Sequence, residues 1–251
     1  MANLVMLLGE GATEYDFLTN TIIEALTGGL KYRLSEAEIP LRDGVAVATA
    51  SKSAREIGIS GMAVADTQAL LQTKRDNLEQ ALNRKARQKW RIFDDRYIWV
   101  WLQSYSIAEI SGGAYMSFAW HLTLIADDPY FESVTENQIT NSASIVVTNN
   151  GNAPAWPIYA ITAPVGGLTS AVMGNSTTGK SLTWSKSPAM PLGQILTVNM
   201  LDQTMDENGT KPLINLSAGD FWSISPGNNT VTFTSNPASA AYTMKWRDRW
   251  N

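Results

Sequence analysis

The chain has 251 residues, which is enough for one large all-β domain or for two domains of ordinary size. Hydrophobic residues make up 44% of it and charged residues 17%, so a buried core is expected and disorder is not. The formal net charge of -4 argues against a dedicated nucleic-acid-binding protein, and the lack of cysteine excludes disulfides, thiolate metal sites and cysteine nucleophiles.

The N-terminal region reads as mixed secondary structure. Its start, MANLVMLLGEG, is a brief apolar run without a basic segment, so neither a secretory signal nor membrane insertion is expected. Leu4 to Leu8 is predicted to form a strand, and the spacing of apolar residues predicts a helix over Thr13 to Leu26 that stops at Gly28-Gly29. Pro40 to Ser53 is rich in small and polar residues, which favours a projecting arm or hairpin.

One amphipathic helix stands out further along the chain. It is predicted over about residues 66–87, with Asp66 or Thr67 as its N-terminal cap. Leu71, Leu78 and Leu82 form one stripe, and charged residues cover the rest of the surface. This pattern indicates a helix that lies on a sheet.

Three strands are expected around this helix, namely Arg55 to Val64 before it and Arg96 to Tyr105 and Tyr115 to Ile125 after it. The second of these is apolar on both faces, which indicates burial on both sides, either under the helix or against another subunit. One face is aromatic and the other aliphatic; the residues are Tyr97, Trp99, Trp101 and Tyr105 against Ile98, Val100 and Leu102.

The composition changes near residue 133. From there the chain is rich in Thr, Ser, Asn, Gly and Pro, and short apolar runs recur between turn signals. This spacing is typical of an antiparallel sandwich or barrel. The expected fold class is therefore mainly β with one prominent helix, in two domains over residues 1–132 and 133–251.

The last thirty residues predict an antiparallel meander of three strands. Turns are expected at Ser225-Pro226-Gly227-Asn228 and at Asn236-Pro237. In the final strand an aromatic face is expected to pack in the core and a basic face to contact solvent or a partner. The first face holds Tyr242, Met244, Trp246 and Trp250, and the second holds Thr243, Lys245, Arg247 and Arg249.

One segment matches a phosphate-binding motif letter for letter. Gly174-Asn-Ser-Thr-Thr-Gly179-Lys180-Ser181 fits G-x-x-x-x-G-K-[ST]. That motif requires a helix directly after the lysine, because the helix N-terminus holds the phosphates. Here the following residues indicate a strand and then Pro188, so a glycine-rich β-turn is predicted and Lys180 is assigned no nucleotide.

No other residues suggest an enzyme. His121 is the single histidine, so a catalytic triad or a histidine zinc site has no second imidazole. The pairs Asp94-Asp95 and Asp127-Asp128 sit at turn positions, and neighbours on a strand point to opposite faces. We therefore predict no catalytic residue, no metal site and no cofactor.

The nine tryptophans are the stronger candidates for binding. Trp156, Trp184 and Trp222 lie in the β-rich half, where an exposed indole could stack on a sugar ring. Their positions on alternating strands favour core and interface packing instead.

Three segments resemble the distal tail proteins of long-tailed, non-contractile (siphovirus-type) bacteriophages. They are Trp90 to Tyr130, which includes WRIFDDRY and FAWHLTLIADDPY, then Asn149 to Pro157 (NNGNAPAWP), and the closing Phe221 to Trp250. With the preceding helix, the resemblance spans about residues 66–251. It implies a first, ring-forming (belt) domain built as a β-sandwich with the helix, and a second, galectin-like β-sandwich on the outside of the ring.

The resemblance also implies a function. Such proteins are structural parts of the tail tip, or baseplate, in the virion, and are made in the cytoplasm of the bacterial host. Their rings, often hexameric, join the tail tube protein to the tail hub and the receptor-binding proteins. The expected partners are therefore copies of this chain and those tail proteins, with no sequence-specific nucleic acid.

Two alternatives remain open from the sequence. The first is a lectin-like carbohydrate-binding β-sandwich that uses an exposed tryptophan. The second is a tail tube or other tail-completion protein, although a tube subunit would not need the second domain.

Overall fold

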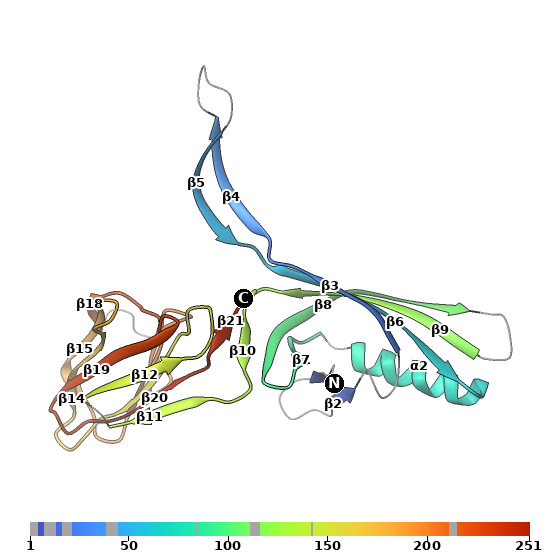
Figure 1. The fold of residues 1–251 in the computed structure, drawn as a ribbon. Helices are drawn as coiled ribbons and strands as arrows, with labels where there is room; N and C mark the ends of the chain where they lie inside the picture. The colour runs from blue at the N-terminus through green and yellow to red at the C-terminus, as the bar shows by residue number, and fades with distance from the viewer. Residues whose placement is uncertain are drawn as a thin grey trace. The chain divides into compact units, whose positions relative to one another are not determined.

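The computed structural model describes residues 5–7, 14–16, 22–38, 45–83, 85–110, 116–141, 143–210 and 215–251. The chain divides into two compact units: Met1–Phe131 with Asn251, called unit 1 here, and Glu132–Trp250, called unit 2. Antiparallel strands dominate both units, and α2 (Gln68–Leu82) is the single helix among the described residues (Figure 1). The predicted fold class is confirmed.

Unit 1 is built on one antiparallel sheet. Its strands lie in the order β2 (Glu14–Asp16), β1 (Val5–Leu7), β7 (Gln88–Phe93), β8 (Arg96–Ile110), β9 (Met116–Ala126), β6 (Arg55–Ala65) and β3 (Ile22–Gly28). The long strands β8, β9 and β6 form its middle. Their buried positions include Ile98, Val100, Phe118, Leu122, Leu124, Ile57 and Ile59.

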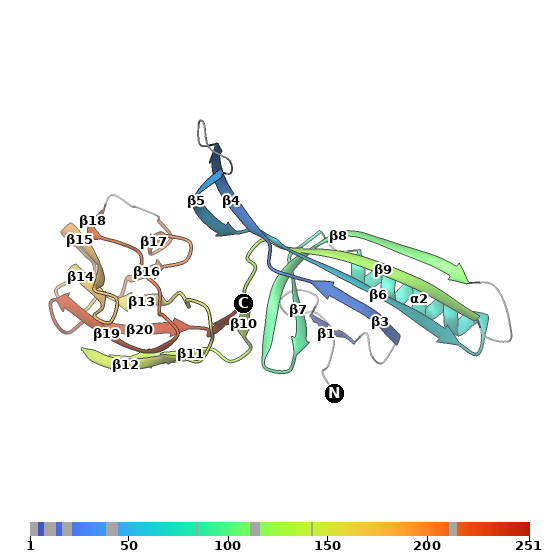
Figure 2. The ribbon, with the colours of Figure 1, turned by 45° about the horizontal axis from the view of Figure 1, so that its top comes forward.

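The helix α2 lies on one face of this sheet, along β6 and β9 (Figure 2). Thr67 caps it, because its hydroxyl accepts a hydrogen bond from Leu70 N at 3.3 Å. The buried residues of the helix are Leu78, Ala81 and Leu82. The predicted helix to about residue 87 is too long, because Asn83 already leaves the helical conformation and the chain must turn there to enter β7.

The prediction of a helix over Thr13 to Leu26 is wrong. The structure has β2 in its first part and β3 in its second, and β3 pairs with β6 from Ile22↔Met62 to Gly28↔Ile57. A bulge between Ile23 and Ala25 shifts the register of β3. A shift of this kind disturbs the two-residue alternation that identifies a strand, and β-branched Ile22 and Ile23 suit a strand.

A two-stranded ribbon continues from β3 and β6. It consists of β4 (Tyr32–Glu38) and β5 (Val45–Lys52), which among the described strands form a separate two-stranded sheet, and we call it the arm. The arm stands away from the sheet of unit 1 (Figure 1). The sequence predicted an arm or hairpin over residues 40–53; the ribbon begins earlier, at Tyr32, and residues 39–44 lie outside the described part.

Unit 2 is a sandwich of two five-stranded antiparallel sheets. The first sheet has the order β11 (Asn137–Thr140), β20 (Ala241–Trp246), β13 (Ile158–Thr162), β16 (Ile195–Asn199) and β17 (Thr204–Glu207). The second has the order β12 (Ser144–Asn149), β19 (Gly227–Asn236), β14 (Leu168–Asn175), β15 (Lys180–Met190) and β18 (Leu216–Gly219). Two short strands, β10 (Phe131–Ser133) and β21 (Arg249–Trp250), pair with each other.

Aromatic side chains fill the space between the two sheets of unit 2. The rings of Phe233 and Tyr242 lie 4.1 Å apart, and Tyr159 lies 6.1 Å from Trp222. Trp222 is 1% exposed, and its indole N–H donates to Met173 O at 3.0 Å. Removing a large indole from water while its N–H keeps a hydrogen-bond partner stabilises the core of unit 2.

The predicted closing meander is wrong in its pairing. β19 belongs to the second sheet and β20 to the first, so the two strands face each other across the core and do not pair. Before β19, Ile224 makes only a single bridge to Ala155, and no strand forms there. Gly227 has a φ of 86°, in agreement with the turn predicted at that glycine.

Candidate functional site

The residues weighed for chemistry hold structural positions. β14 ends at Asn175 and β15 begins at Lys180, so a hairpin turn and then a strand occupy the phosphate-motif segment, as predicted. The buried Asn175 side chain shapes the turn, because its Oδ1 accepts from Thr177 N at 3.1 Å. No helix N-terminus is present there to hold a phosphate.

His121 and the carboxylate pairs are also separated from one another. His121 is exposed on β9, with its Nε2 3.4 Å from Thr123 Oγ1. Asp95 accepts two hydrogen bonds from Arg96, which lower the pKa of its carboxyl, and Asp127 pairs with Arg87 at 2.9 Å. Within the described part of the chain, no three His, Asp or Glu residues form a group that could hold a metal ion.

Of the three tryptophans considered for sugar stacking, two are unavailable. Trp184 is 0% exposed and Trp222 is 1% exposed, both inside the sandwich. Trp156 is only partly buried and lines a hollow of about 200 Å³ in unit 2. We call this hollow the Trp156 hollow; its other lining residues include Ile158, Leu201, Glu136 and Lys245.

The polar groups of the Trp156 hollow are largely paired with one another. Glu136 binds Lys245 at 2.9 Å and Arg247 at 3.8 Å, so its charge is balanced within the hollow. Asn199 accepts hydrogen bonds from Leu201 N and Asp202 N. Trp246 differs, because it is 7% exposed and its Nε1 has no hydrogen-bond partner. The hollow thus offers one apolar wall and few free polar groups.

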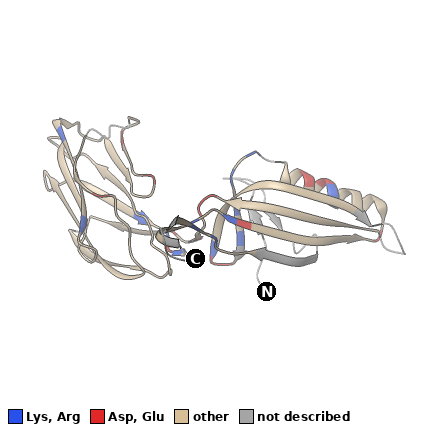
Figure 3. Ribbon diagram, turned by 90° about the horizontal axis from the view of Figure 1, so that it is seen from above, with Lys and Arg blue, Asp and Glu red and all other residues tan. Residues whose placement is uncertain are grey.

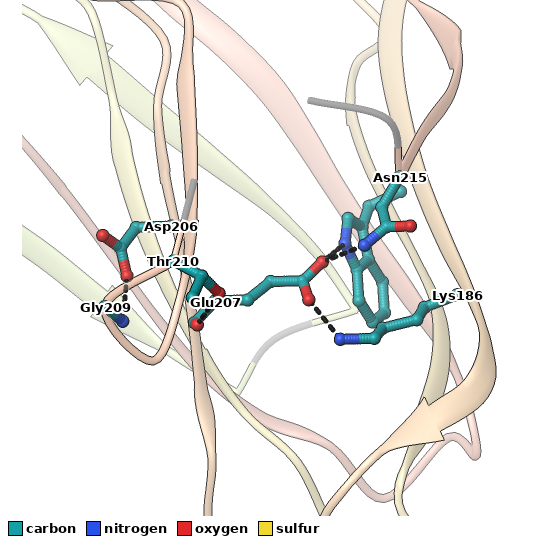
Figure 4. A network of polar contacts seen from close by, with 7 residues as sticks. Lys186, Asp206, Glu207, Gly209, Thr210 and Asn215 are labelled. Carbon is teal, nitrogen blue, oxygen red and sulfur yellow. Dashed lines mark hydrogen bonds and ion pairs between the residues drawn. The ribbon is translucent and has the colours of Figure 1, made fainter. Parts of the chain in front are cut away.

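A buried carboxylate that the sequence analysis missed lies elsewhere in unit 2. Glu207 on β17 is 4% exposed and accepts from Trp184 Nε1 at 2.8 Å, Asn215 Nδ2 at 2.6 Å and Lys186 Nζ at 2.5 Å (Figure 4). Burial alone would raise the pKa of this carboxyl. The bonds from Lys186, Asn215 and Trp184 outweigh that effect and lower the pKa below its usual range.

The Glu207 network connects the two sheets, because β17 belongs to the first and the strand that carries Trp184 and Lys186 to the second. Its carboxylate oxygens are occupied by donors, so we interpret it as a structural element and not as an acid–base pair. A sequence signal existed: Met205 and Glu207 are two residues apart on a strand, which places both on the buried face.

The final strand also differs from the prediction. It breaks at Arg247-Asp248, and Arg249 is 3% exposed, so the expected basic face reaches solvent at Lys245 and only in part at Arg247. Trp246 is buried as predicted, whereas Trp250 is only partly buried. The break lets the buried Asp248 carboxylate accept from Asn137 at 3.2 Å and Asn150 at 2.9 Å.

The residues of the NNGNAPAWP segment hold this loop in place through hydrogen bonds and a close backbone approach. Asn149 is buried, and its side chain donates to Ala153 O at 2.8 Å and accepts from Gly151 N at 3.0 Å. A Cβ at Gly151 would lie 1.9 Å from Arg249 O, so only glycine fits at this close approach. This segment therefore joins the start of unit 2 to its last strand.

In unit 1 the aromatic face of β8 opens to solvent. Ile98 and Val100 are buried on the face of the sheet that the helix covers. Trp101 is 43% exposed on the other face of the sheet, which we call the bare face. Between Leu102 and Ser104 the pairing with β9 shifts by one residue, so Tyr105 pairs with Leu122 and turns to the helix side. The prediction that Trp101 and Tyr105 share a face is wrong because of this bulge.

Cations lie against the aromatic rings of the bare face. Arg87 lies 5.3 Å and Lys89 4.9 Å from the Trp99 ring centroid. Ser104 pairs with Thr123 and is exposed on the same side as Trp101. We call Arg87, Lys89, Trp99, Trp101 and Ser104 the Trp101 patch.

The rest of the bare face carries little charge. Along β6 and β9 its outward positions are small, hydroxyl-bearing or apolar apart from His121, and Glu56 is the one formal charge among them. Figure 3 shows these strands largely in tan, whereas red and blue gather on the helix. An uncovered sheet face with this composition is suited to contact another protein.

Comparison with known proteins identifies a family model and solved structures that are similar to this chain. Residues 150–250 match the family model described as siphovirus-type tail component, C-terminal domain. The resemblance to the distal tail proteins is confirmed. The fold of the full chain is similar to that of the SPP1 Dit (gp 19.1) protein, with a TM-score of 0.73, 17% sequence identity and coverage of 100% of both chains.

Two structures of a phage baseplate also contain a chain whose fold is similar to that of this protein. The phage P2 baseplate in its activated conformation with Ca gives a TM-score of 0.50 at 12% identity, over 98% of each chain. The phage p2 baseplate with Sr gives 0.51 at 10% identity, over 97% of each chain. Comparison with curated protein sequences gave no match.

Among the described residues, no helix has both the length and the apolar character required to cross a membrane.

Proposed function

We propose that this protein is a structural component of a phage tail tip, where copies of it form a ring that joins the tail tube to the hub and the receptor-binding apparatus. The observation that carries the proposal is the likeness of fold, over the full length of both chains, to a protein described as a paradigm of the hub adsorption apparatus. The family match of residues 150–250 to a tail component supports the same role.

We assign the ring to unit 1 and a position outside the ring to unit 2, and expect six copies, as the resemblance implies. The bare face and the arm support this division, because both present uncovered apolar side chains that a neighbouring subunit could bury. We propose no enzymatic activity. The histidine and the paired carboxylates that were considered for catalysis lie apart, in strand and turn positions.

Negative-stain electron microscopy combined with mass measurement of the purified protein tests the ring. Closed rings of uniform diameter, and binding of these rings to purified tail tube protein, are expected. A protein that remains monomeric at high concentration and joins no tail component would contradict the proposal.

A second candidate function, saccharide binding, is favoured by one observation only. The partly buried Trp156 forms an apolar wall next to charged and amide groups in the Trp156 hollow, an arrangement that suits a sugar ring. A glycan array followed by tryptophan fluorescence titration tests it. Quenching by one defined sugar that is lost in Trp156→Ala but kept in Leu192→Ala, at an exposed site outside the hollow, would support this function.

A further inference from the structure

The Trp156 hollow lies on the outer face of the first sheet of unit 2. Ile158 on β13 pairs with Lys245 on β20 and with Asn199 on β16, so these three side chains form one row across the sheet. Trp156 and Leu201 each lie two residues from a member of this row and line the hollow with it. Ile158 is 40% exposed and Leu201 42% exposed, so the apolar side chains of the hollow are open to a ligand.

The backbone holds Trp156 in place from both sides. Before it, Ala155 and Ile224 exchange two hydrogen bonds, of 2.9 Å and 2.7 Å. After it, Pro157 O accepts a hydrogen bond from Met200 N at 3.2 Å. A side chain on a fixed backbone loses little freedom when a ligand binds, so this apolar wall of the hollow is preformed.

A charged pair borders the apolar wall. Glu136 binds Lys245 at 2.9 Å, and Arg247 lies 3.8 Å from the same carboxylate. Arg247 also donates to Ser133 O at 2.8 Å and to Val134 O at 2.5 Å, which fixes its guanidinium. The side chains of Glu136 and Lys245 remain 38% and 45% exposed, so the pair leaves acceptor and donor positions accessible side by side.

The charges around the hollow favour a neutral ligand. Two acidic and two basic residues line it at positions that are not fully buried, namely Glu132, Glu136, Lys245 and Arg247, whereas Arg249 is only 3% exposed. A charged ligand would therefore meet a group of its own sign as well as one of the opposite sign.

A sugar ring combines the features that this site requires. One face of the ring consists of C–H groups, which pack on an indole, and its hydroxyl groups both donate and accept hydrogen bonds. Two neighbouring hydroxyls thus match a carboxylate acceptor next to an ammonium donor. The hollow holds about 200 Å³, less than the roughly 300–1,000 Å³ of pockets for drug-sized ligands, so it suits one ring better than a chain of rings.

We propose that the Trp156 hollow binds one neutral hexose ring, with the apolar face of the ring on Trp156 and two neighbouring hydroxyls on Glu136 and Lys245. The inference rests on the saccharide-binding function proposed above and names the ligand class and the contacts that select it. It does not depend on whether copies of the chain form a ring.

Ligand-observed NMR with methyl hexopyranosides tests this binding on the full chain. The methyl glycosides of glucose, galactose and mannose are the neutral probes, and the matching methyl hexuronide of each is the charged probe. Saturation transfer is expected for at least one neutral probe and to be strongest at the protons of one ring face. The matching hexuronide should bind about tenfold more weakly, because its carboxylate meets the acidic side chains of the hollow.

Two variants test the contacts. Trp156→Ala should weaken binding of the neutral probe about tenfold, because the stacking surface is removed. Glu136→Gln should also weaken it about tenfold, because the charged acceptor is lost, and its exposed position preserves folding. The matched control is Asp220→Asn, which removes an exposed carboxylate of unit 2 outside the hollow and should leave the affinity unchanged.

Three results would overturn the inference. A neutral probe that binds Trp156→Ala and Glu136→Gln as tightly as the natural protein would reject this site and leave saccharide binding elsewhere on the protein standing. A hexuronide that binds as tightly as its neutral counterpart would reject the neutral ligand class. If no probe binds up to the solubility limit of the sugar, the saccharide-binding function and this inference fall together, and the ring proposal stands.

Discussion

Units 1 and 2 are of similar size and both are β-rich, yet among the described residues the exposed aromatic side chains lie in unit 1. In unit 2 aromatic residues from both sheets meet in the core, as Phe233 and Tyr242 do, and a partly buried ion pair between Lys186 and Glu207 connects the sheets. In unit 1 the exposed set includes Tyr32, Leu34 and Trp101. Exposed aromatic side chains of this kind are typical of a surface that contacts another protein.

The largest effect is expected for Trp222→Ala in unit 2. The change removes a fully buried indole and leaves Met173 O without its donor, so the free energy of unfolding of unit 2 should fall by about 4 kcal/mol. Urea denaturation followed by circular dichroism measures it. Trp156→Ala, at a partly buried position, is the control and should cost less than half as much. Equal losses in the two variants would show that the core of unit 2 is not as described.

The next effect tests how the start of unit 2 is joined to its last strand. In Gly151→Ala the new Cβ meets Arg249 O, so backbone must move and unit 2 should lose about 3 kcal/mol. Gly29→Ala is the control, because nothing lies within 4 Å of a Cβ there. Thermal unfolding should show a clear fall of the midpoint for the first variant alone. An unchanged midpoint in Gly151→Ala would contradict the close approach at this site.

The Glu207 network should respond to both mutation and pH. Glu207→Gln removes the charge that pairs with Lys186, and a loss of about 2 kcal/mol is expected at neutral pH. Because the folded state lowers the pKa of this carboxyl, its contribution is complete above the unfolded pKa of about 4.3 and is lost as pH falls through the lower folded value.

The difference in unfolding free energy between the natural protein and Glu207→Gln should therefore shrink below about pH 4.3. Urea denaturation at several pH values measures this difference. The control Asp206→Asn keeps an acceptor for Gly209 N and should change stability by no more than about 0.5 kcal/mol. A difference that grows as the pH falls would contradict the direction of the pKa shift.

The smallest effect on stability and the largest on assembly are expected together, for Trp101→Ser. The side chain is 43% exposed, so the free energy of unfolding should change by no more than about 1 kcal/mol. The fraction of protein in rings should fall at least tenfold if the bare face is an interface. Leu192→Ser, at an exposed site in unit 2, is the control for both measurements. Unchanged ring formation in Trp101→Ser would contradict the proposal that the exposed aromatic residues of unit 1 form an interface.

The sequence predicted the elements whose pattern is local. The helix at Gln68–Leu82 has a capping residue and a leucine stripe, and the turn before Lys180 follows from its glycine and asparagine. These features depend on residues close together in the chain, so they can be read without the fold.

The errors share a different cause, because each depends on partners distant in sequence. The single extra residue at Gln103 turns Tyr105 away from Trp101, and the pairing of Ile22 with Met62 makes a strand where a helix was expected. Likewise, β19 and β20 follow each other in the chain but enter opposite sheets. Long-range pairing decided all three, and no alternation within one segment reports it.

The hydrogen bond from Ser133 N to Asp248 O, together with the pairing of β10 and β21, has a consequence for modularity. The polypeptide therefore enters and leaves unit 2 at neighbouring points, so the first and last residues of the sandwich lie close together. Loops far from that entry can lengthen, shorten or be replaced without altering the distance between the two ends. Unit 2 can therefore vary in sequence and loop length without altering the structure of unit 1.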